Sequence, residues 1–204
     1  MKYIDFQNTF KNHTLIDVRE VKNIFPDFES RRFYEWQKKN YIKKITKLFY
    51  FFVDKKINEN DIRYIANKLL EPSYLSLEYA LRYYNLIPEI VYSITSITTR
   101  KTKIISTEIS NFQYRSIKEN LFFAYKIIKI NETSFKMAEP EKALLDFLYL
   151  RSDIKNENDI EELRLNKEVF KEIINQEKLK QYTEVFNSKT LSAKIVKINK
   201  IMKC

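Results

Sequence analysis

The chain of 204 residues contains no glycine, and this absence limits the turns and loops that it can form. Glycine is the residue that reaches positive φ without a steric penalty. The Walker A loop and the dinucleotide-binding fingerprint both need several glycines at fixed spacing. The sequence therefore excludes both phosphate-binding loops, and it predicts that asparagine and serine occupy the turns.

The composition indicates a folded protein without metal or cofactor. Hydrophobic residues make up 44% of the chain and aromatic residues 15%, which is enough for a packed core. No apolar run approaches the roughly 18 residues that span a membrane, and the N-terminus lacks the apolar stretch of a signal peptide. Cys204 is the only cysteine and His13 the only histidine, so we expect neither a disulfide framework nor a zinc site of these residue types. The predicted protein is soluble and cytoplasmic.

Positive charge is concentrated in one short segment. The chain has a net charge of +10, and residues 28–50 hold seven basic and two acidic side chains, which is half of that excess. A lysine-rich composition explains a high total charge, but it does not explain this placement. The distribution therefore points to a nucleic-acid contact within this segment.

Residues 1–56 are predicted to form a winged helix-turn-helix. Apolar side chains recur at helical spacing, Pro26 breaks the second helix, and two β-rich segments joined by a basic turn predict a hairpin. The expected elements are helices at 4–12, 16–25 and 28–39 and strands at 41–45 and 49–53.

Residues 57–204 are predicted to form a second, mixed α/β domain, which makes the whole protein α+β. This domain is expected to contain a mainly antiparallel sheet and a tail of about three amphipathic helices after residue 159. The predicted helices lie at 61–70, at 76–85 and from 139 onward. The predicted strands lie at 91–98, 103–107, 112–117, 121–130 and 134–137.

The outer face of the 28–39 helix carries the residue types that read DNA. Arginine pairs with guanine in a bidentate manner, glutamine pairs with adenine, and serine, tyrosine and lysine contact phosphates. The candidate residues on the helix are Ser30, Arg31, Arg32, Tyr34, Gln37 and Lys38. Lys43, Lys44 and Lys47 are expected to contact DNA from the hairpin wing. The alternative is a non-catalytic interaction module whose basic helix is simply solvated.

Two other groups of residues offer alternative functions. Glu139, Glu141, Lys142 and Asp146 loosely resemble the carboxylate-plus-lysine set of a nuclease, but acidic residues also suit a helix start without any metal. A run of hydroxyl side chains followed by basic residues could bind phosphate. It consists of Thr95, Ser96, Thr98 and Thr99, followed by Arg100, Lys101 and Lys103. A β-strand with one solvated face is the simpler interpretation of this second pattern. His13 is expected in a loop or on the surface.

Several blocks of the sequence resemble a known family. Three of them are FYEWQKKNYI at 33–42, PSYLSLEYAL at 72–81 and EPEKALLD at 139–146. Shorter matching blocks are IANK at 65–68, YNLIPE at 84–89, SITS at 93–96, TTRKT at 98–102, YRSI at 114–117 and FFAY at 122–125. Over roughly residues 10 to 190 the chain resembles the AbiEi-type antitoxins, which are transcriptional regulators of type IV toxin–antitoxin and abortive-infection loci.

The resemblance implies a function as well as a fold. It implies an N-terminal winged helix that represses its own operon at inverted repeats in double-stranded operator DNA. It also implies a C-terminal domain that opposes a nucleotidyltransferase toxin without necessarily binding it, and no catalytic activity. The candidate residues from 30 to 38 fall on the family's recognition helix, and the three lysines fall on its wing.

The chain departs from the family pattern mainly at four positions where glycine is expected. These positions are occupied by Asn40, Leu48, Asn85 and Ala124. Asparagine tolerates positive φ, so Asn40 and Asn85 are mild replacements. Leucine does not tolerate it, so the sequence predicts a strained or reshaped wing turn at Leu48.

Overall fold

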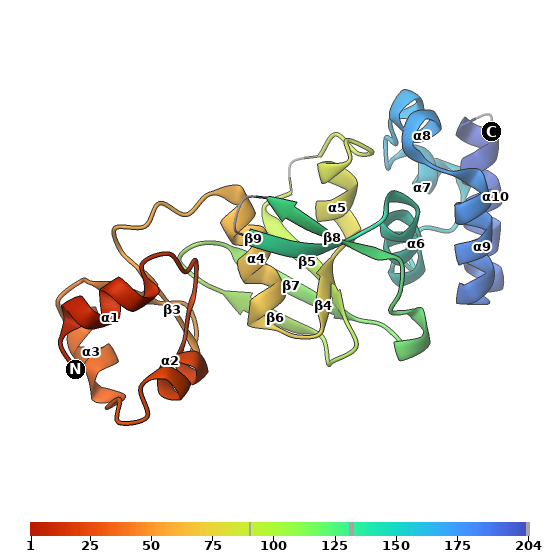
Figure 1. Ribbon diagram of the computed structural model, residues 1–204. Coiled ribbons are helices and arrows are strands. Elements are labelled where there is room, and N and C mark those ends of the chain that lie inside the picture. The colour runs from red at the N-terminus through yellow and green to blue at the C-terminus, as the bar shows by residue number, and fades with distance from the viewer. Residues whose placement is uncertain (90, 131–132, 203–204) are drawn as a thin grey trace.

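The computed structural model describes residues 1–89, 91–130 and 133–202 of the chain (Figure 1). The protein has an α+β fold, in which a small three-stranded sheet near the N-terminus precedes a mixed six-stranded sheet. The α+β prediction is therefore confirmed. Cys204 lies outside the described residues.

The first 52 residues form three helices and an antiparallel sheet with strand order β1-β3-β2. We call these residues the N-terminal unit. Its elements are α1 (Tyr3–Phe10), β1 (Ile16–Asp17), α2 (Val18–Ile24), α3 (Arg31–Lys38), β2 (Ile42–Lys44) and β3 (Phe49–Phe52). The helix predicted at 16–25 begins only at Val18, because the two residues before it pair with β3. Asp17 then caps the helix by accepting a hydrogen bond from the backbone N–H of Arg19.

Three of the four expected glycine positions have a left-handed backbone. Asn40, Asn85 and Ala124 have φ values of 56°, 57° and 51°. Alanine carries a steric cost of about 1–2 kcal/mol in this conformation, so Ala124 is the least favourable of the three. Leu48 is not among the residues with positive φ, so of the two predicted outcomes, a strained or a reshaped turn, the reshaped turn is the one that fits. The hydroxyl of Thr46 accepts a hydrogen bond from the Leu48 N–H, which closes this turn without a left-handed residue at Leu48.

The second sheet has the strand order β6-β7-β5-β4-β9-β8. Its strands are β4 (Ser73–Leu75), β5 (Ser93–Thr98), β6 (Lys103–Ser106), β7 (Asn111–Ser116), β8 (Tyr125–Ile130) and β9 (Thr133–Ala138). The β5–β7 and β4–β9 pairs are parallel, and the other three pairs are antiparallel. The sheet is therefore mixed, and three of its five strand pairs are antiparallel, in line with the prediction of a mainly antiparallel sheet. Strand β4, which the sequence interpretation left out, lies between β5 and β9 and belongs to one of the two parallel pairs.

Helix α4 (Glu59–Leu69) covers one face of this sheet. Its N-terminus has a capping box, in which Asn58 and Asp61 exchange hydrogen bonds between side chain and backbone. Tyr114 of β7 reaches the helix and donates a hydrogen bond of 2.6 Å to the carbonyl of Ala66. This bond involves two fully buried residues, so it links sheet and helix away from solvent.

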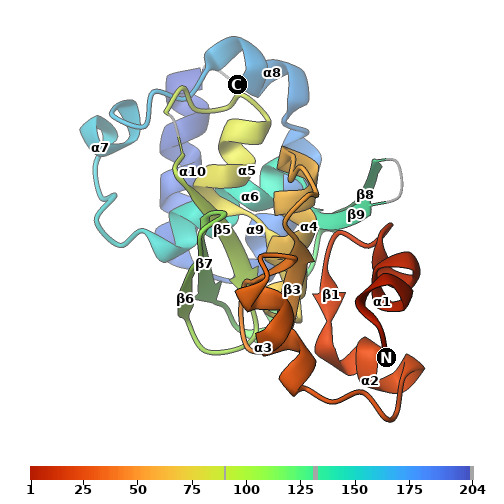
Figure 2. The same cartoon turned by 90° about the vertical axis from the view of Figure 1, so that its left-hand side faces the viewer.

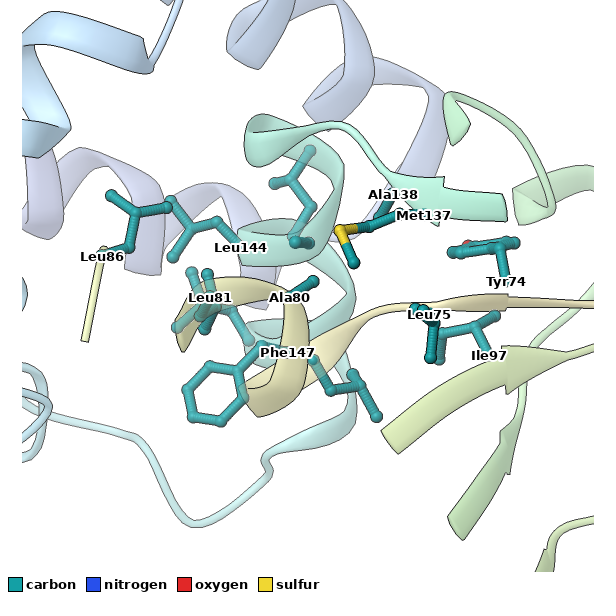
Figure 3. Packing of buried hydrophobic residues seen from close by; sticks show 14 of the residues in the cluster. Tyr74, Leu75, Ala80, Leu81, Leu86, Ile97, Met137, Ala138, Leu144 and Phe147 are labelled. Carbon is teal, nitrogen blue, oxygen red and sulfur yellow. The ribbon is translucent and has the colours of Figure 1, made fainter. Parts of the chain in front are cut away.

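Helices α5 (Leu77–Tyr83) and α6 (Pro140–Leu150) pack against each other beside the sheet. Figure 3 shows Ala80 and Leu81 of α5 next to Leu144 and Phe147 of α6. Pro140 occupies the first turn of α6, where its missing N–H costs no hydrogen bond. The 3-10 turn η1 (Glu119–Leu121) ends at the residue where a strand was predicted to begin, and β8 starts only at Tyr125.

The described tail contains one short helix that spans residue 159 and three longer helices after it, in agreement with the prediction of about three. They are α7 (Glu157–Glu161), α8 (Lys167–Ile173), α9 (Gln176–Phe186) and α10 (Lys189–Met202). The buried side chain of Lys194 fastens α10 to the end of α6 by donating to the carbonyls of Leu148 and Arg151, at 2.8 and 2.7 Å. Figure 1 shows the tail on the opposite side of the six-stranded sheet from the N-terminal unit.

The N-terminal unit also contacts the rest of the chain directly. Leu15 and Phe49 pack into the large hydrophobic cluster that contains the six-stranded sheet. The hydroxyl of Thr14 donates a buried hydrogen bond of 3.0 Å to Asp61 of α4. Figure 2 shows β1 and β3 next to α4, in agreement with these contacts. The predicted boundary after residue 56 is therefore crossed by apolar and polar contacts.

Candidate nucleic-acid interface

Helix α3 is held in place by aromatic side chains on its inner face. Phe33 and Trp36 are three residues apart, so they lie on the same side of the helix, and both are buried. The ring of Phe33 stacks on Tyr50 of β3, with centroids 4.6 Å apart and an interplanar angle of 6°. The ring of Trp36 lies 4.5 Å from Phe6 of α1. This packing determines which face of α3 is turned to solvent.

The opposite face of α3 carries most of the residues that were predicted to contact DNA. The side chain of Arg31 is 81% exposed, and Tyr34 is 59% exposed. Ser30 and Lys38 are also exposed, whereas Arg32 is half-buried. The ammonium group of Lys38 lies 4.7 Å from the centre of the Tyr34 ring. Two cations and an aromatic ring are thus presented together on one solvent-facing surface.

Glu35 is a member of this surface that the sequence interpretation missed. Its carboxylate lies 3.3 Å from Nε of Arg31 and 3.6 Å from Nη1 of Arg32. The spacings of four and three residues along a helix could have revealed both pairs. Exposed pairs of this kind are worth only about 0.3–0.5 kcal/mol each, so Glu35 orients the two guanidinium groups more than it stabilises the fold.

Gln37 does not point freely into solvent. Its side-chain amide donates a hydrogen bond of 3.1 Å to the carbonyl of Phe33, one turn back along α3. The residue is half-buried. To pair with a base, Gln37 has to exchange this backbone contact for the base edge.

The hairpin of β2 and β3 follows α3 closely. Asn40 makes the left-handed turn, and the N–H of Tyr41 donates to the carbonyl of Trp36 at 2.9 Å. Lys43 and Lys44 are both exposed, but as neighbours on β2 they point to opposite faces of the strand. Lys47, in the turn before β3, is exposed as well. The three predicted wing lysines are therefore accessible, but they do not form a single face.

Lys43 has a partner that no sequence pattern predicted. Its ammonium group donates a hydrogen bond of 3.0 Å to the carboxylate of Glu108, in the turn between β6 and β7. The two residues are 65 positions apart in the chain. The β2–β3 hairpin is thus tied electrostatically to the edge of the six-stranded sheet.

The segment proposed as a nuclease site is part of the protein core. Lys142 and Asp146 are fully buried, and their side chains form an ion pair with each other. Asp146 also accepts hydrogen bonds of 2.9 Å from the hydroxyls of Tyr74 and Ser76. Burial lowers the pKa of Lys142 and raises that of Asp146, while the hydrogen bonds and the opposite charge counteract both shifts. A substrate cannot reach these two groups in this structure.

The two glutamates of the same segment hold the tail. Glu141 accepts a hydrogen bond of 2.7 Å from the backbone N–H of Asn175, just before α9. Glu139 accepts from Lys178 at 3.0 Å and from Tyr182 at 2.8 Å, both on α9. Burial raises the pKa of Glu139, but these hydrogen bonds and the nearby lysines outweigh burial and leave the pKa below its ordinary value. These contacts give the acidic residues a structural role.

The hydroxyl residues of β5 form a strand, as predicted, but the strand has no solvated face. Thr95, Ser96 and Thr98 are buried, because β5 has neighbours on both sides and packed helices nearby. Thr95 donates to the carbonyl of Ser76 at 2.8 Å, and Thr98 donates to the carbonyl of Pro72 at 2.7 Å. The expectation of a solvated face was wrong, and these hydroxyls are not available to bind phosphate.

His13 lies in the loop after α1, with Nε2 3.3 Å from the carboxylate of Glu20. Within residues 1–89, 91–130 and 133–202, no three histidine, cysteine, aspartate or glutamate side chains are grouped so that they could hold a metal ion. In the same part of the chain, no helix has the length and apolar character needed to cross a bilayer.

Comparison with known proteins adds no identification. No protein-family model matches the chain, and no curated protein matches it.

Proposed function

We propose that the protein is a DNA-binding regulator whose N-terminal unit is a winged helix-turn-helix. The element order α1-β1-α2-α3-β2-β3, with β1, β3 and β2 in one antiparallel sheet, is the order of that motif. In helix-turn-helix proteins the second helix of the motif lies in the major groove. Here that helix is α3, and β2 and β3 form the wing.

The observation that carries this proposal is the outer face of α3. The aromatic anchors turn Arg31, Tyr34 and Lys38 to solvent together, within the segment that holds half of the net positive charge. Arg31 is the residue that we assign to a base edge, since a guanidinium can donate two parallel hydrogen bonds to guanine. Tyr34 and Lys38 are assigned to phosphates, which position the helix without reading the sequence.

The remaining candidate residues have supporting roles in this proposal. Gln37 is held by the Phe33 carbonyl, so it contacts a base only after this bond is exchanged. Glu35 pairs with Arg31 as well as with Arg32, so Arg31 also has to leave or share this carboxylate to reach a base, and Arg32, which is less exposed, has the supporting role. Ser30 precedes the first turn of α3 and makes no side-chain capping bond, which leaves its hydroxyl available for a phosphate. Lys43 and Lys47 are assigned to the DNA backbone beside the groove. Lys44 points to the opposite face of β2 from Lys43, so it is not assigned to the same contact.

We further propose that the protein is an autoregulatory antitoxin of a type IV toxin–antitoxin system, located in the cytoplasm. The support is the resemblance to AbiEi-type antitoxins, and one contact in the core strengthens it. The blocks at 72–81 and 139–146, which carry much of the resemblance, bond to each other through Tyr74, Ser76, Lys142 and Asp146. Segments that meet in the core define a fold together, so a match in both is more informative than a match in either.

Two measurements in cells test the two halves of this proposal. A reporter driven by the DNA upstream of the protein's own gene should be repressed when the protein is supplied, and less repressed with Arg31→Ala. The exposed variant Lys180→Ala on α9 serves as the matched control. If the wild-type protein does not change reporter expression, the autoregulatory half of the proposal is wrong.

The antitoxin half is tested by growth. A neighbouring gene for a nucleotidyltransferase toxin, expressed alone, should arrest growth, and coexpression of this protein should restore it. Because the toxin need not be bound directly, restored growth without copurification agrees with the proposal. A toxin that still arrests growth when this protein is present contradicts it.

A further inference from the structure

A hollow of about 470 Å³ lies beside α5 and α6, away from α3. Figure 1 shows α5 and α6 on the side of the sheet remote from the N-terminal unit. The walls come from α5, from the start of β5, from β7, from α6 and from the segment after α7. A volume of this size is typical of sites that bind small molecules.

The floor of the hollow is apolar and built into the core. Ile87 and Phe147 are buried, and Leu163 and Val91 are half-buried. Figure 3 shows Phe147 packed beside Ala80 and Leu81, so the floor is fixed by the contact between α6 and α5. A ligand here therefore has an apolar body.

The rim of the hollow is acidic, although the chain as a whole carries a charge of +10. Glu78, Glu89 and Glu162 contribute carboxylates to the lining, and Arg151 contributes the one basic group among the lining residues. Within residues 1–89, 91–130 and 133–202, neither Glu89 nor Glu162 has an ion-pair partner. We call this hollow the carboxylate pocket.

The positive charge of Arg151 is already balanced within the protein. Its guanidinium donates to both carboxylate oxygens of Asp153, at 2.9, 3.0 and 2.6 Å, and lies 3.9 Å from Glu78. These bonds lower the pKa of Asp153 to about 2, so the pair stays ionised at neutral pH. The uncompensated charge of the pocket is therefore negative.

The neutral polar groups of the pocket also favour a ligand that donates hydrogen bonds. The hydroxyl of Thr95 is occupied by Ser76 and Tyr79. The amide N–H of Gln113 donates to the Ser93 hydroxyl at 3.1 Å, which leaves the Gln113 carbonyl oxygen as an acceptor. At the rim, Tyr92 is 84% exposed and offers an aromatic face, which attracts cations.

We propose that the carboxylate pocket binds an organic cation with an apolar body, of the aryl-alkyl amine class. The apolar part fills the space above Phe147, and the ammonium group faces Glu89 and Glu162. This site does not depend on the DNA-binding function, because it shares no residue with the outer face of α3.

Three probes that share a four-carbon chain separate the contributions of charge and apolar body. The probes are 4-phenylbutylamine, the neutral 4-phenylbutan-1-ol, and 1,4-diaminobutane, and binding is measured by titration calorimetry on the full chain. The proposal expects 4-phenylbutylamine to bind more tightly than both other probes. It is overturned if 4-phenylbutylamine does not bind up to its solubility limit, or if either of the other probes binds equally well.

Variants of the rim then locate the site. Glu89→Gln and Glu162→Gln should each lower the affinity for 4-phenylbutylamine by about fivefold, as expected for the loss of one partly exposed charge pair. Both residues are exposed, so these variants should fold normally, and Glu172→Gln on α8 is the matched exposed control. Unchanged affinity in the rim variants, or an equal loss in the control, overturns the assignment. The affinity of the same variants for operator DNA should not change. A failure of the amine-binding proposal therefore does not count against the proposed DNA-binding function.

Discussion

The ammonium group of Lys43 on the β2–β3 hairpin donates a hydrogen bond of 3.0 Å to the carboxylate of Glu108, in the turn between β6 and β7 at the edge of the six-stranded sheet. A lysine that we assign to the DNA backbone is therefore neutralised by an acid of the larger part of the protein. The pair is exposed, with 45% and 72% of its side chains accessible, so it is weak and sensitive to salt. Under the proposed function, duplex DNA and Glu108 would compete for the same cation.

Removing this competitor should strengthen DNA binding. We expect Glu108→Gln to raise operator affinity by about twofold to fivefold at low salt, because Lys43 is released and one negative charge is removed. The gain should shrink as salt rises, and fluorescence anisotropy across a salt series measures it. Glu172→Gln is the control for a general change in net charge. A loss of affinity in Glu108→Gln contradicts the assignment of Lys43 to phosphate.

The buried pair of Lys142 and Asp146 should be far more important to folding than to any reaction. Lys142→Met leaves a carboxylate without its cation in the core, which is expected to cost about 3–5 kcal/mol of unfolding free energy. Replacing both partners, as Lys142→Met with Asp146→Leu, should recover much of that loss. Urea denaturation of the two variants distinguishes the cases. Equal stability loss in the single and double variants would show that packing, rather than the unpaired charge, dominates.

The contacts of Glu139 with α9 should make the attachment of the tail sensitive to acid. Its pKa is lowered in the folded protein, so its contribution to stability is complete above its ordinary pKa of 4.5 and is lost as pH falls through the lower folded value. Glu139→Gln should therefore be less stable than the wild type at neutral pH, and the difference should shrink toward pH 3. Chemical denaturation between pH 3 and 7 measures this, with the exposed Glu177→Gln as control. A difference that grows on acidification has the wrong sign for this account.

Local patterns were sufficient to predict α3 and the direction of its outer face. Phe33 and Trp36 stand three residues apart, and a helix places such residues on one side whatever surrounds it. The same rule would have revealed the contacts of Glu35 with Arg31 and Arg32. The left-handed backbone at Asn40, Asn85 and Ala124 was expected from the glycines of the resembled family, and the structure has positive φ at all three positions.

Features that depend on distant partners were not predictable from local patterns. Strand β4 has only three residues and follows Pro72, so it resembles a loop until β5 and β9 are placed on either side of it. The hydroxyl face of β5 looked solvated because alternation does not reveal what packs on a strand. The contact between Lys43 and Glu108 joins residues 65 positions apart, and charge alone does not select this pair among the many lysines of the chain.

The central claim is that α3 reads DNA through Arg31, and competition between two duplexes tests it most directly. One duplex carries the sequence upstream of the protein's own gene, and the other is a scrambled duplex of the same length and composition. The wild type should prefer its own sequence by about a thousandfold or more at physiological salt. Arg31→Ala should lose about 1–3 kcal/mol of binding to that duplex and much less to the scrambled one. Equal binding of both duplexes by the wild type, or an unchanged preference in Arg31→Ala, would contradict the claim.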